Sequence, residues 1–565
     1  MNQPATALPS TPVLDQGHPR KWLILAAVSL GMFMTLLDVT IVNIAIPTII
    51  KDLNTTVATV SWVISAYSLA LAVLFLSMGR FGDKFGLKRV FLCGLAVFSI
   101  FSLACGFAPS AGWLTAFRVG QGVGGAAMAP ISLAIVFGVF PRRLQGIAVG
   151  LWGALGMVAA AVGPTLGGVL SEYASWHWVF FINAPIGVIA LVLCWWVVPK
   201  REAQHTTAGI DVVGVLVSAA GLFCLVLGLI QANTWGWTSP KTLALFAIAV
   251  VSFPLFAWWE LRSSAPMFDF RLLRIRSFTA SNITMVLIGA TMGGSLFLLP
   301  IFLVSVLGYS ELNAALAITP MPVAGLLVAP MVGRVTDRIG PRLPSAVGVA
   351  SFGVGTLLLS QLTGQSTAMS VAWRVVIIGV GMGFVFPAVS SAAMGSLPAK
   401  VAGVGSGTLN TLRQVGFSLG IAVLVALFSH QMVVSLTDAV QQSRTFVESQ
   451  TALPAAARTQ IEASLTKTLE SAKQGGAAGV TIADPLAGAP VAQAGTPLAQ
   501  EQATIKATLG GIFRDDVAKA FKWPYYLAAI LSFLAVFPAL FTGRRIGEHA
   551  GHEEMSHAER AAEST

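Results

Sequence analysis

Long apolar stretches separated by short polar links occupy most of the chain. A helix needs about 20 apolar residues to cross the hydrocarbon core of a bilayer. Fourteen stretches of that kind lie at residues 22–46, 59–79, 90–109, 112–138, 145–170, 178–198, 211–231, 241–259, 278–307, 314–333, 343–363, 371–395, 403–434 and 523–543. The first stretch is too long for a signal peptide and no small-residue cleavage site follows it, so it is interpreted as an anchor. The pattern predicts an all-α polytopic membrane protein with 14 transmembrane helices.

Composition supports this interpretation. Of the 565 residues, 55% are hydrophobic and 10% are charged, whereas a soluble protein carries about 25% charged residues. This composition excludes a soluble enzyme, a disordered chain and a disulfide scaffold. The four cysteines lie in apolar stretches and are expected to be small core residues. No metal site, cofactor motif or enzymatic activity is predicted.

The distribution of positive charge predicts the topology. If the N-terminus is inside, 21 of the 34 Lys and Arg residues fall on inner segments. Cytoplasmic loops are enriched in Lys and Arg. We therefore expect a multi-pass protein of the cytoplasmic (inner) membrane with both termini in the cytoplasm. The net charge of +10 is then a feature of topology, and no nucleic-acid partner is predicted.

Two polar links repeat one another. Residues 79–86 read GRFGDKFG and residues 333–340 read GRVTDRIG, at an offset of 254. At an offset of 257, three further pairs of small residues coincide between spans 4 and 12, and three more between spans 5 and 13. Parallel repeats of six spans are one layout of secondary transporters, which hold substrate between the two halves. The repeat predicts two six-helix bundles with two extra central spans.

This organisation divides the chain into five predicted regions. They are a cytoplasmic N-terminal leader (1–21), an N-terminal six-helix bundle (22–198), two additional spans with flanking cytoplasmic loops (199–277), a C-terminal six-helix bundle (278–543) and a cytoplasmic tail (544–565). The C-terminal bundle includes an external loop at 435–522. Its composition favours a charged tether or a cap over a folded domain, with weak helical patterning at its flanks.

Several motifs resemble a known family. The first span holds LDVTIVNIAIP at 37–47, the fourth holds RVGQG at 118–122, and the fifth holds GPTLGG at 163–168. Together with the link at 79–89, these resemble the fourteen-span drug:proton antiporter family of the major facilitator superfamily. The resemblance implies the major-facilitator fold and proton-coupled export. It does not specify a substrate.

Asp38 is the carboxylate that lies deepest within a predicted span. A charge at bilayer depth costs about 2.5–3.5 kcal/mol on insertion scales, so such residues tend to be functional. Asp38 lies about 12 Å below the outer end of its span and Arg118 about 9 Å below the outer end of its own. We predict that the two form an ion pair that couples proton movement to transport. The alternative is a structural carboxylate capped by helix ends or by Asn43.

Two further arginines lie within predicted spans. Arg374 is about three residues from the end of its span and is expected to extend its side chain to the interface. Arg413 lies about 15 Å from the inner end of its span. It is a second buried cation and a candidate pocket residue.

The repeated links are interpreted as a cytoplasmic gate. Glycines allow tight turns, and Asp83 is expected to accept hydrogen bonds from the N-terminus of a neighbouring helix. Leu87 departs from the family pattern, in which a basic residue is usual. The predicted gate residues are Gly79, Asp83, Lys84, Gly86, Arg89, Gly333, Asp337, Arg338 and Gly340.

The fifth span carries the motif that the resemblance associates with antiport. Small residues allow helices to approach closely, so generic packing is the alternative interpretation. The motif residues are Gly153, Gly156, Gly163, Pro164, Gly167 and Gly168. Apolar and aromatic residues of the central spans are candidates for the substrate pocket, namely Phe33, Met34, Trp152, Met157, Phe297 and Phe386, together with Arg413.

The sequence thus predicts a proton-coupled multidrug efflux antiporter for amphipathic or cationic small molecules. Its expected partners are the substrate, protons and the lipid bilayer. The alternatives are a dedicated exporter of one metabolite, lipid or antibiotic, and the inner-membrane component of a multi-protein efflux assembly with a periplasmic or envelope partner.

Overall fold

The computed structural model describes residues 17–55, 57–200, 211–263, 266, 268–398, 401–449, 458–459, 461–466, 470 and 497–543. Most of the predicted leader and the whole predicted tail lie outside this part of the chain, as does the link at 201–210. The described residues form α-helices and short 3-10 turns. The helices are α1 (Lys21–Asp52), α2 (Val57–Phe85), α3 (Leu87–Gly106), α4 (Ala111–Val139), α5 (Gln145–Tyr173), α6 (Trp178–Phe181), α7 (Asn183–Val197), α8 (Val212–Trp235), α9 (Pro240–Glu260), α10 (Arg276–Ser305), α11 (Glu311–Ile318), α12 (Pro320–Ile339), α13 (Arg342–Leu359), α14 (Ala368–Gly395), α15 (Ala402–Ser449), α17 (Pro497–Ala520) and α18 (Lys522–Ala539).

The predicted count of spans is confirmed. Fourteen helical segments of the described chain are long and apolar enough to cross a membrane. Three of the spans contain a break between two α-helices: α6 and α7 form the sixth span, α11 and α12 form the tenth, and the end of α17 with α18 forms the fourteenth. Proline is favoured in the first turn of a helix, where its missing N–H is not needed, which suits Pro320 at the start of α12.

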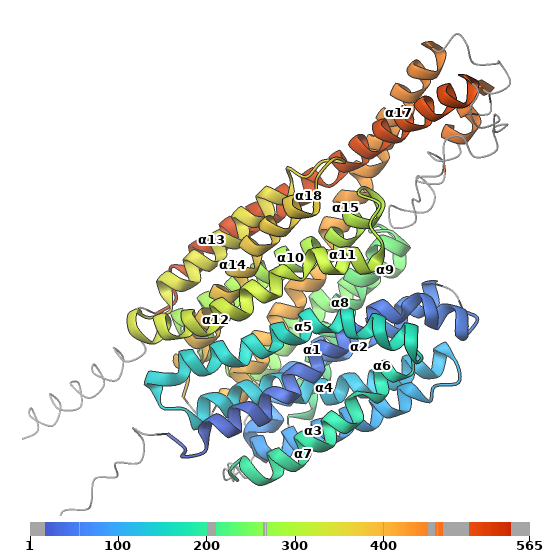
Figure 1. Cartoon of the computed structure of the whole chain (residues 1–565). Helices are drawn as coiled ribbons and strands as arrows, with labels where there is room; N and C mark the ends of the chain where they lie inside the picture. Colours follow the sequence, from blue (N-terminus) through green and yellow to red (C-terminus); the bar gives the residue numbers. More distant parts are fainter. Residues whose placement is uncertain are drawn as a thin grey trace, which may run out of the picture.

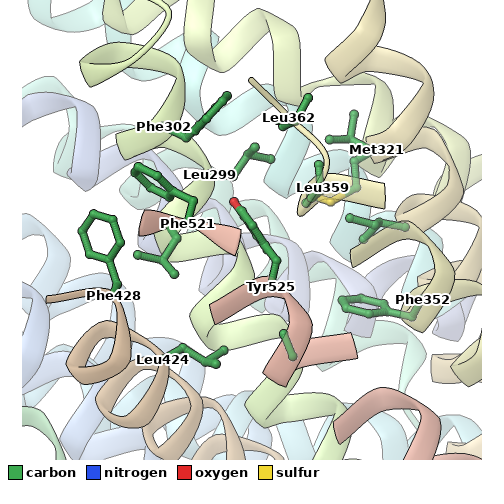
Figure 2. Packing of buried hydrophobic residues seen from close by; sticks show 14 of the residues in the cluster. Leu299, Phe302, Met321, Phe352, Leu359, Leu362, Leu424, Phe428, Phe521 and Tyr525 are labelled. Carbon is green, nitrogen blue, oxygen red and sulfur yellow. The ribbon is translucent and has the colours of Figure 1, made fainter. Parts of the chain in front are cut away.

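The spans form two bundles that pack side by side (Figure 1). In the N-terminal bundle α4 packs against α2 and α3, and α1 packs against α5; in the C-terminal bundle α14 packs against α12 and α13, and α10 packs against α15. Each bundle has its own apolar core. Figure 2 shows the C-terminal core, where Phe302, Phe428 and Phe521 meet beside Tyr525. The predicted repeat is therefore also a repeat of packing.

The two bundles meet chiefly along two helix pairs. α2 contacts α15, and α5 contacts α12. Of the two additional spans, α8 contacts both α2 and α15, whereas α9 packs chiefly on α8. We call the end of the molecule that carries residues 79–86 and 333–340 the latch face, and the opposite end the distal face.

The described flanks of the long external loop form a folded helical projection. α15 continues for 48 residues to Ser449, and α17 returns beside it towards α18 (Figure 1). Apolar side chains lie between them, including Val447, Leu509 and Phe513. Helix α17 agrees with the weak helical patterning predicted for the flank of this loop. The two helices pack on each other because apolar positions recur at helical spacing from 440 to 447 and from 505 to 517, whereas the sequence favoured a charged tether or a cap over a folded domain.

Candidate functional site

Asp38 on α1 and Arg118 on α4 form an ion pair inside the N-terminal bundle. Gln121, one turn further along α4, joins both groups: its Nε2 donates to Asp38 Oδ1 at 2.8 Å, and its Oε1 accepts from Arg118 Nη1 at 2.7 Å. Arg118 Nε also donates to the Val63 carbonyl oxygen at 3.1 Å. The predicted ion pair is therefore present, within a network of three side chains.

The network is enclosed by protein. Asp38 and Gln121 are 0% exposed and Arg118 is 1% exposed. The Arg118 guanidinium lies 4.1 Å from the centroid of the Tyr67 ring, a cation–π distance. Removing one partner of a buried ion pair costs about 3–5 kcal/mol, because the other charge is left uncompensated. Asp38 can accept a proton chemically, and in this conformation the helices around it must move before water reaches it.

Glycines of α5 bring its backbone against the segment of α1 that carries Asp38. A Cβ at Gly163 would lie 1.9 Å from Thr40 Oγ1, and one at Gly167 would lie 2.8 Å from the Ile41 carbonyl oxygen. A Cβ at either Gly153 or Gly168 would meet nothing within 4 Å. The predicted motif thus divides into glycines that the packing requires and glycines that it does not.

Gly156 and Pro164 are the remaining predicted positions of the motif, and only Gly156 can be assessed by its contacts. A Cβ at Gly156 would lie 2.8 Å from the Leu36 Cδ1 atom, the flexible end of a side chain. Pro164 lies within α5, and its side chain is outside the described residues. The side chain of Asn43, the suggested alternative partner of Asp38, is also outside them.

Each bundle places an aspartate on a helix N-terminus of the other bundle. Near the end of α2, the Asp83 carboxylate accepts hydrogen bonds from the backbone N–H groups of Gly403 and Val404 at the start of α15, both at 2.8 Å. The first N–H groups of a helix have no partner within it, and the helix dipole favours an anion there. The predicted contact of Asp83 is therefore present, and its partner helix belongs to the opposite bundle.

Asp337 makes the reciprocal contact. Near the end of α12, its carboxylate accepts from the N–H groups of Gly146 and Ile147 at the start of α5, at 2.7 and 3.0 Å. We call these two aspartates and the four amides that they bind the inter-bundle latch. The positions obey the sequence repeat, because Gly146 and Gly403 are separated by 257 residues.

Close backbone approach explains the glycines of the latch. A Cβ at Gly79 would lie 2.2 Å from the Gly403 carbonyl oxygen, and one at Gly333 would lie 2.3 Å from the Gly146 carbonyl oxygen. Such distances forbid any side chain without movement of the backbone. Gly86 and Gly340, at the ends of the two links, have φ values of 96° and 86°, which glycine adopts without strain.

The basic residues of the links lie at the periphery of the latch. Arg89 and Arg338 are exposed, and the Lys84 ammonium lies 5.9 Å from the Phe85 ring. Leu87, which departs from the family pattern, is buried in the N-terminal core, where an apolar side chain fits. Lys88 instead caps α7, because its Nζ donates to the carbonyl oxygens of Trp195 and Val198 at 2.6 and 2.5 Å.

The predicted pocket residues are not gathered in one place. Met34 and Trp152 lie inside the N-terminal core, where Trp152 Nε1 donates to Ser132 Oγ at 3.0 Å. Met157 lies between the bundles, against Gly325 of α12. Phe33 is half-buried and Phe297 is 41% exposed.

Phe386 and Arg413 are the predicted pocket residues that the structure brings together, with 5.8 Å between the guanidinium and the ring centroid. Arg374, as predicted, lies near the end of its span. Its Nε donates to the Leu358 carbonyl oxygen at 3.0 Å, and its guanidinium lies 4.4 Å from the Trp373 ring.

Sequence reasoning missed the roles of Gln121 and Tyr67 in the charged network. Gln121 lies three residues after Arg118, which places both side chains on one face of α4, so the spacing carried the signal. Tyr67 lies on α2, and no sequence pattern linked it to either α1 or α4.

A polytopic membrane protein with two repeated bundles and a charged network at membrane depth belongs structurally to the secondary transporters. The model of the family described as Major Facilitator Superfamily matches residues 28–421. The chain belongs to this superfamily.

Curated relatives include proteins named for drug resistance. The chain is 35% identical over 413 residues to the tetracenomycin C resistance and export protein of Streptomyces glaucescens, covering 73% of this chain and 77% of the relative. It is 35% identical over 405 residues to the multidrug resistance protein Stp of Mycobacterium tuberculosis (strain CDC 1551 / Oshkosh), covering 71% and 75%. It is 31% identical over 405 residues to the methylenomycin A resistance protein of Streptomyces coelicolor, covering 71% and 84%.

Solved structures of low sequence identity share the fold. A crystal structure of the human organic anion transporter MFSD10 superposes with a TM-score of 0.55 at 15% identity, covering 72% of this chain and 93% of the other. A bacterial homologue of the human lysosomal transporter Spinster, inward-facing and unoccupied, gives a TM-score of 0.52 at 14% identity, covering 92% and 98%. These two comparisons bear on the fold alone.

Proposed function

We propose that the chain is a proton-coupled efflux antiporter that exports amphipathic small molecules across the cytoplasmic membrane. The observation that carries the proposal is the buried network of Asp38, Arg118 and Gln121. Protonation of Asp38 would remove the negative partner of Arg118, whose own charge persists at any physiological pH. The field within the N-terminal bundle would then change at the point where α1 meets α5.

The inter-bundle latch would control access of the exported molecule to the space between the bundles. The asymmetry of positive charge along the sequence supports a cytoplasmic position for the latch face. With both aspartates on their helix N-termini, this face is held closed, and breaking these contacts would admit cargo from the cytoplasm. Rocking of two bundles about a central site is the general mode of such transporters.

The test is dye efflux in inverted membrane vesicles, comparing the wild type with Asp38→Asn. Addition of an amphipathic dye should partly collapse the proton gradient in wild-type vesicles and leave it intact in the variant. Arg374→Gln, which alters an arginine outside the network, is the matched control and should behave as wild type. Equal collapse by the wild type and Asp38→Asn would remove Asp38 from the coupling role.

A dedicated exporter of one compound is the second candidate. It is favoured by the names of two relatives, each of which is named for one antibiotic. A resistance panel in a host lacking its own pumps separates the two functions. Resistance to structurally unrelated drugs supports multidrug export, and resistance to one compound supports the dedicated exporter.

A further inference from the structure

Arg413 is a charged side chain at membrane depth without an acidic partner. Its Nη2 donates to Asn410 Oδ1 at 3.1 Å, and its guanidinium lies 5.8 Å from the Phe386 ring centroid. Among the described residues, no carboxylate lies within ion-pair distance of it. The side chain is partly exposed. A lone guanidinium in such surroundings retains most of its capacity to bind an anion.

Arg413 lies on the side of α15 that faces away from α8. On α15, Val415 packs against an apolar group that includes Leu69 and Val226, and the Ala422 carbonyl oxygen accepts from Asn233 of α8 at 3.1 Å. With 3.6 residues per turn, Val415 and Ala422 lie about 160–180° around the helix from Arg413. The side of α15 that meets α8 is thus the side opposite Arg413. Its ring partner, Phe386, lies on α14 within the C-terminal bundle.

The backbone around Arg413 is fixed. A Cβ at Gly289 of α10 would lie 2.4 Å from the Arg413 carbonyl oxygen, and one at Gly416 would lie 2.2 Å from the Val286 carbonyl oxygen. Two helices in such close contact hold the arginine at a set position. A ligand site on rigid elements loses little entropy on binding.

Resting on the proposed function, we propose that Arg413, Asn410 and Phe386 form a subsite for an acidic aromatic group of the exported molecule. The preferred cargo is then an amphipathic organic anion. The planar guanidinium binds a carboxylate or sulfonate through two parallel N–H···O bonds. The apolar surface of Phe386 suits the adjoining ring. Asn410 engages one terminal nitrogen of the guanidinium and orients the remaining donors.

The charges of the described spans disfavour a cationic cargo. A carboxylate is the strongest countercharge that a protein offers a cation, and Asp38 is already engaged by Arg118 and Gln121. A cation beside Arg413 would instead meet a like charge with no acidic residue to offset it. The subsite therefore selects against one of the two cargo classes that the sequence suggested.

Exchange against protons also favours an anion. One proton entering as one monoanion leaves moves two charges down the membrane potential. The membrane potential alone, at about 100 mV, sustains a gradient of about 2,000-fold for the monoanion and about 40-fold for a neutral cargo, whereas a monocation is driven only by the pH difference. The same exchange of one proton for one cargo molecule thus sustains the largest concentration gradient for an acidic cargo.

Binding to the purified full chain in nanodiscs tests this inference without requiring transport. Three naphthalene probes share one ring system: 2-naphthoate is anionic, 2-naphthamide is neutral and 2-naphthylmethylammonium is cationic. We expect the wild type to bind 2-naphthoate most tightly. Arg413→Gln should weaken 2-naphthoate binding at least tenfold, because it removes a charge-assisted hydrogen bond, and should change 2-naphthamide binding less than twofold.

Arg413→Lys keeps the charge without the planar fork and should retain part of the 2-naphthoate affinity. Retained binding of 2-naphthamide shows that each variant is folded. An equal loss of 2-naphthoate and 2-naphthamide binding would overturn the proposal, as would tighter binding of the cation or no binding of 2-naphthoate by the wild type. Arg374→Gln, which alters an arginine outside the subsite, should leave 2-naphthoate binding within twofold. The binding assay uses no proton gradient, so failure of proton coupling in the vesicle assay and failure of the subsite are distinguishable.

Discussion

The two bundles share a frame and differ in chemistry. In the N-terminal bundle Gly122 closely approaches Ala70 and Tyr67, and in the C-terminal bundle the repeat position Gly379 closely approaches Met321. Across the latch, each bundle gives one aspartate and receives one. The contacts that shape and join the bundles were therefore retained in both copies.

The charged network occurs in one copy alone among the described residues. The repeat positions of Arg118 and Gln121 are Val375 and Ile378, both fully buried and apolar. Gly163 approaches Thr40, and its repeat position Gly420 approaches Ala290. Two residues before these contacts stand Asp38 in the N-terminal bundle and Ile288 in the C-terminal bundle, so Ile288 is the counterpart of Asp38. The same glycine contacts, which we call the frame, thus surround an ionic network in the N-terminal bundle and apolar side chains at the repeat positions of the C-terminal bundle. The ionic network distinguishes the bundle that we propose to couple protons from its repeat.

The largest expected effect comes from breaking the ionic network. Arg118→Met should lower the free energy of unfolding by about 3–5 kcal/mol, because Asp38 is left buried without its cation. In the apolar copy, Ile378→Val should cost only about 0.5–1.5 kcal/mol. Thermal unfolding in detergent, followed by tryptophan fluorescence, measures both. A similar cost for the two variants would contradict the contrast between the bundles.

Substitution of the frame should affect both copies alike. Gly163→Ala and Gly420→Ala each place a Cβ less than 2 Å from a neighbouring oxygen, and overpacking of this kind typically costs about 1–3 kcal/mol. Gly168→Ala is the matched control, since a Cβ there meets nothing within 4 Å. It should be neutral or stabilising by up to about 1 kcal/mol. Thermal unfolding in detergent measures all three variants. Destabilisation by Gly168→Ala would contradict the claim that packing requires Gly163 and does not require Gly168.

The latch should weaken equally from either side. Asp83→Asn and Asp337→Asn each replace charge-assisted hydrogen bonds by neutral ones, at a cost of about 1 kcal/mol, or about a fivefold shift towards an open latch face. A Ser406→Cys reporter, placed where the native serine is fully buried, measures this shift by maleimide labelling in a Cys93→Ser background. Unequal effects of the two variants would show that the latch is not reciprocal.

The smallest signal is expected for dications. Asp38 is engaged by Arg118 and Gln121, and its repeat counterpart is the apolar Ile288. A bis-cationic dye therefore finds no free countercharge at these two positions. Its flux in proteoliposomes should stay near that of empty liposomes. Strong, pH-dependent efflux of this dye would show that a further acidic group takes part.

Much of the fold could be predicted from the sequence, because the hydrocarbon thickness dictates the length of each apolar stretch. Asp83 and Arg118 were also predictable, since buried charges require partners of opposite sign or a helix N-terminus. Reciprocity of the latch was not, because the repeat shows that two links are alike without showing which bundle each one touches. The pocket was the hardest to predict: Met34 and Phe386 are equally apolar in sequence, and only packing decides which of them is enclosed.

α15 runs without a break from the amides that bind Asp83 to the distal projection. At 1.5 Å per residue its 48 residues extend for about 72 Å, well beyond the 40–45 Å of a bilayer with its headgroups. Because α17 packs along the far end of α15, one continuous helix connects the distal projection to the latch amides. A load on the projection is therefore expected to reach the latch directly through the backbone of α15.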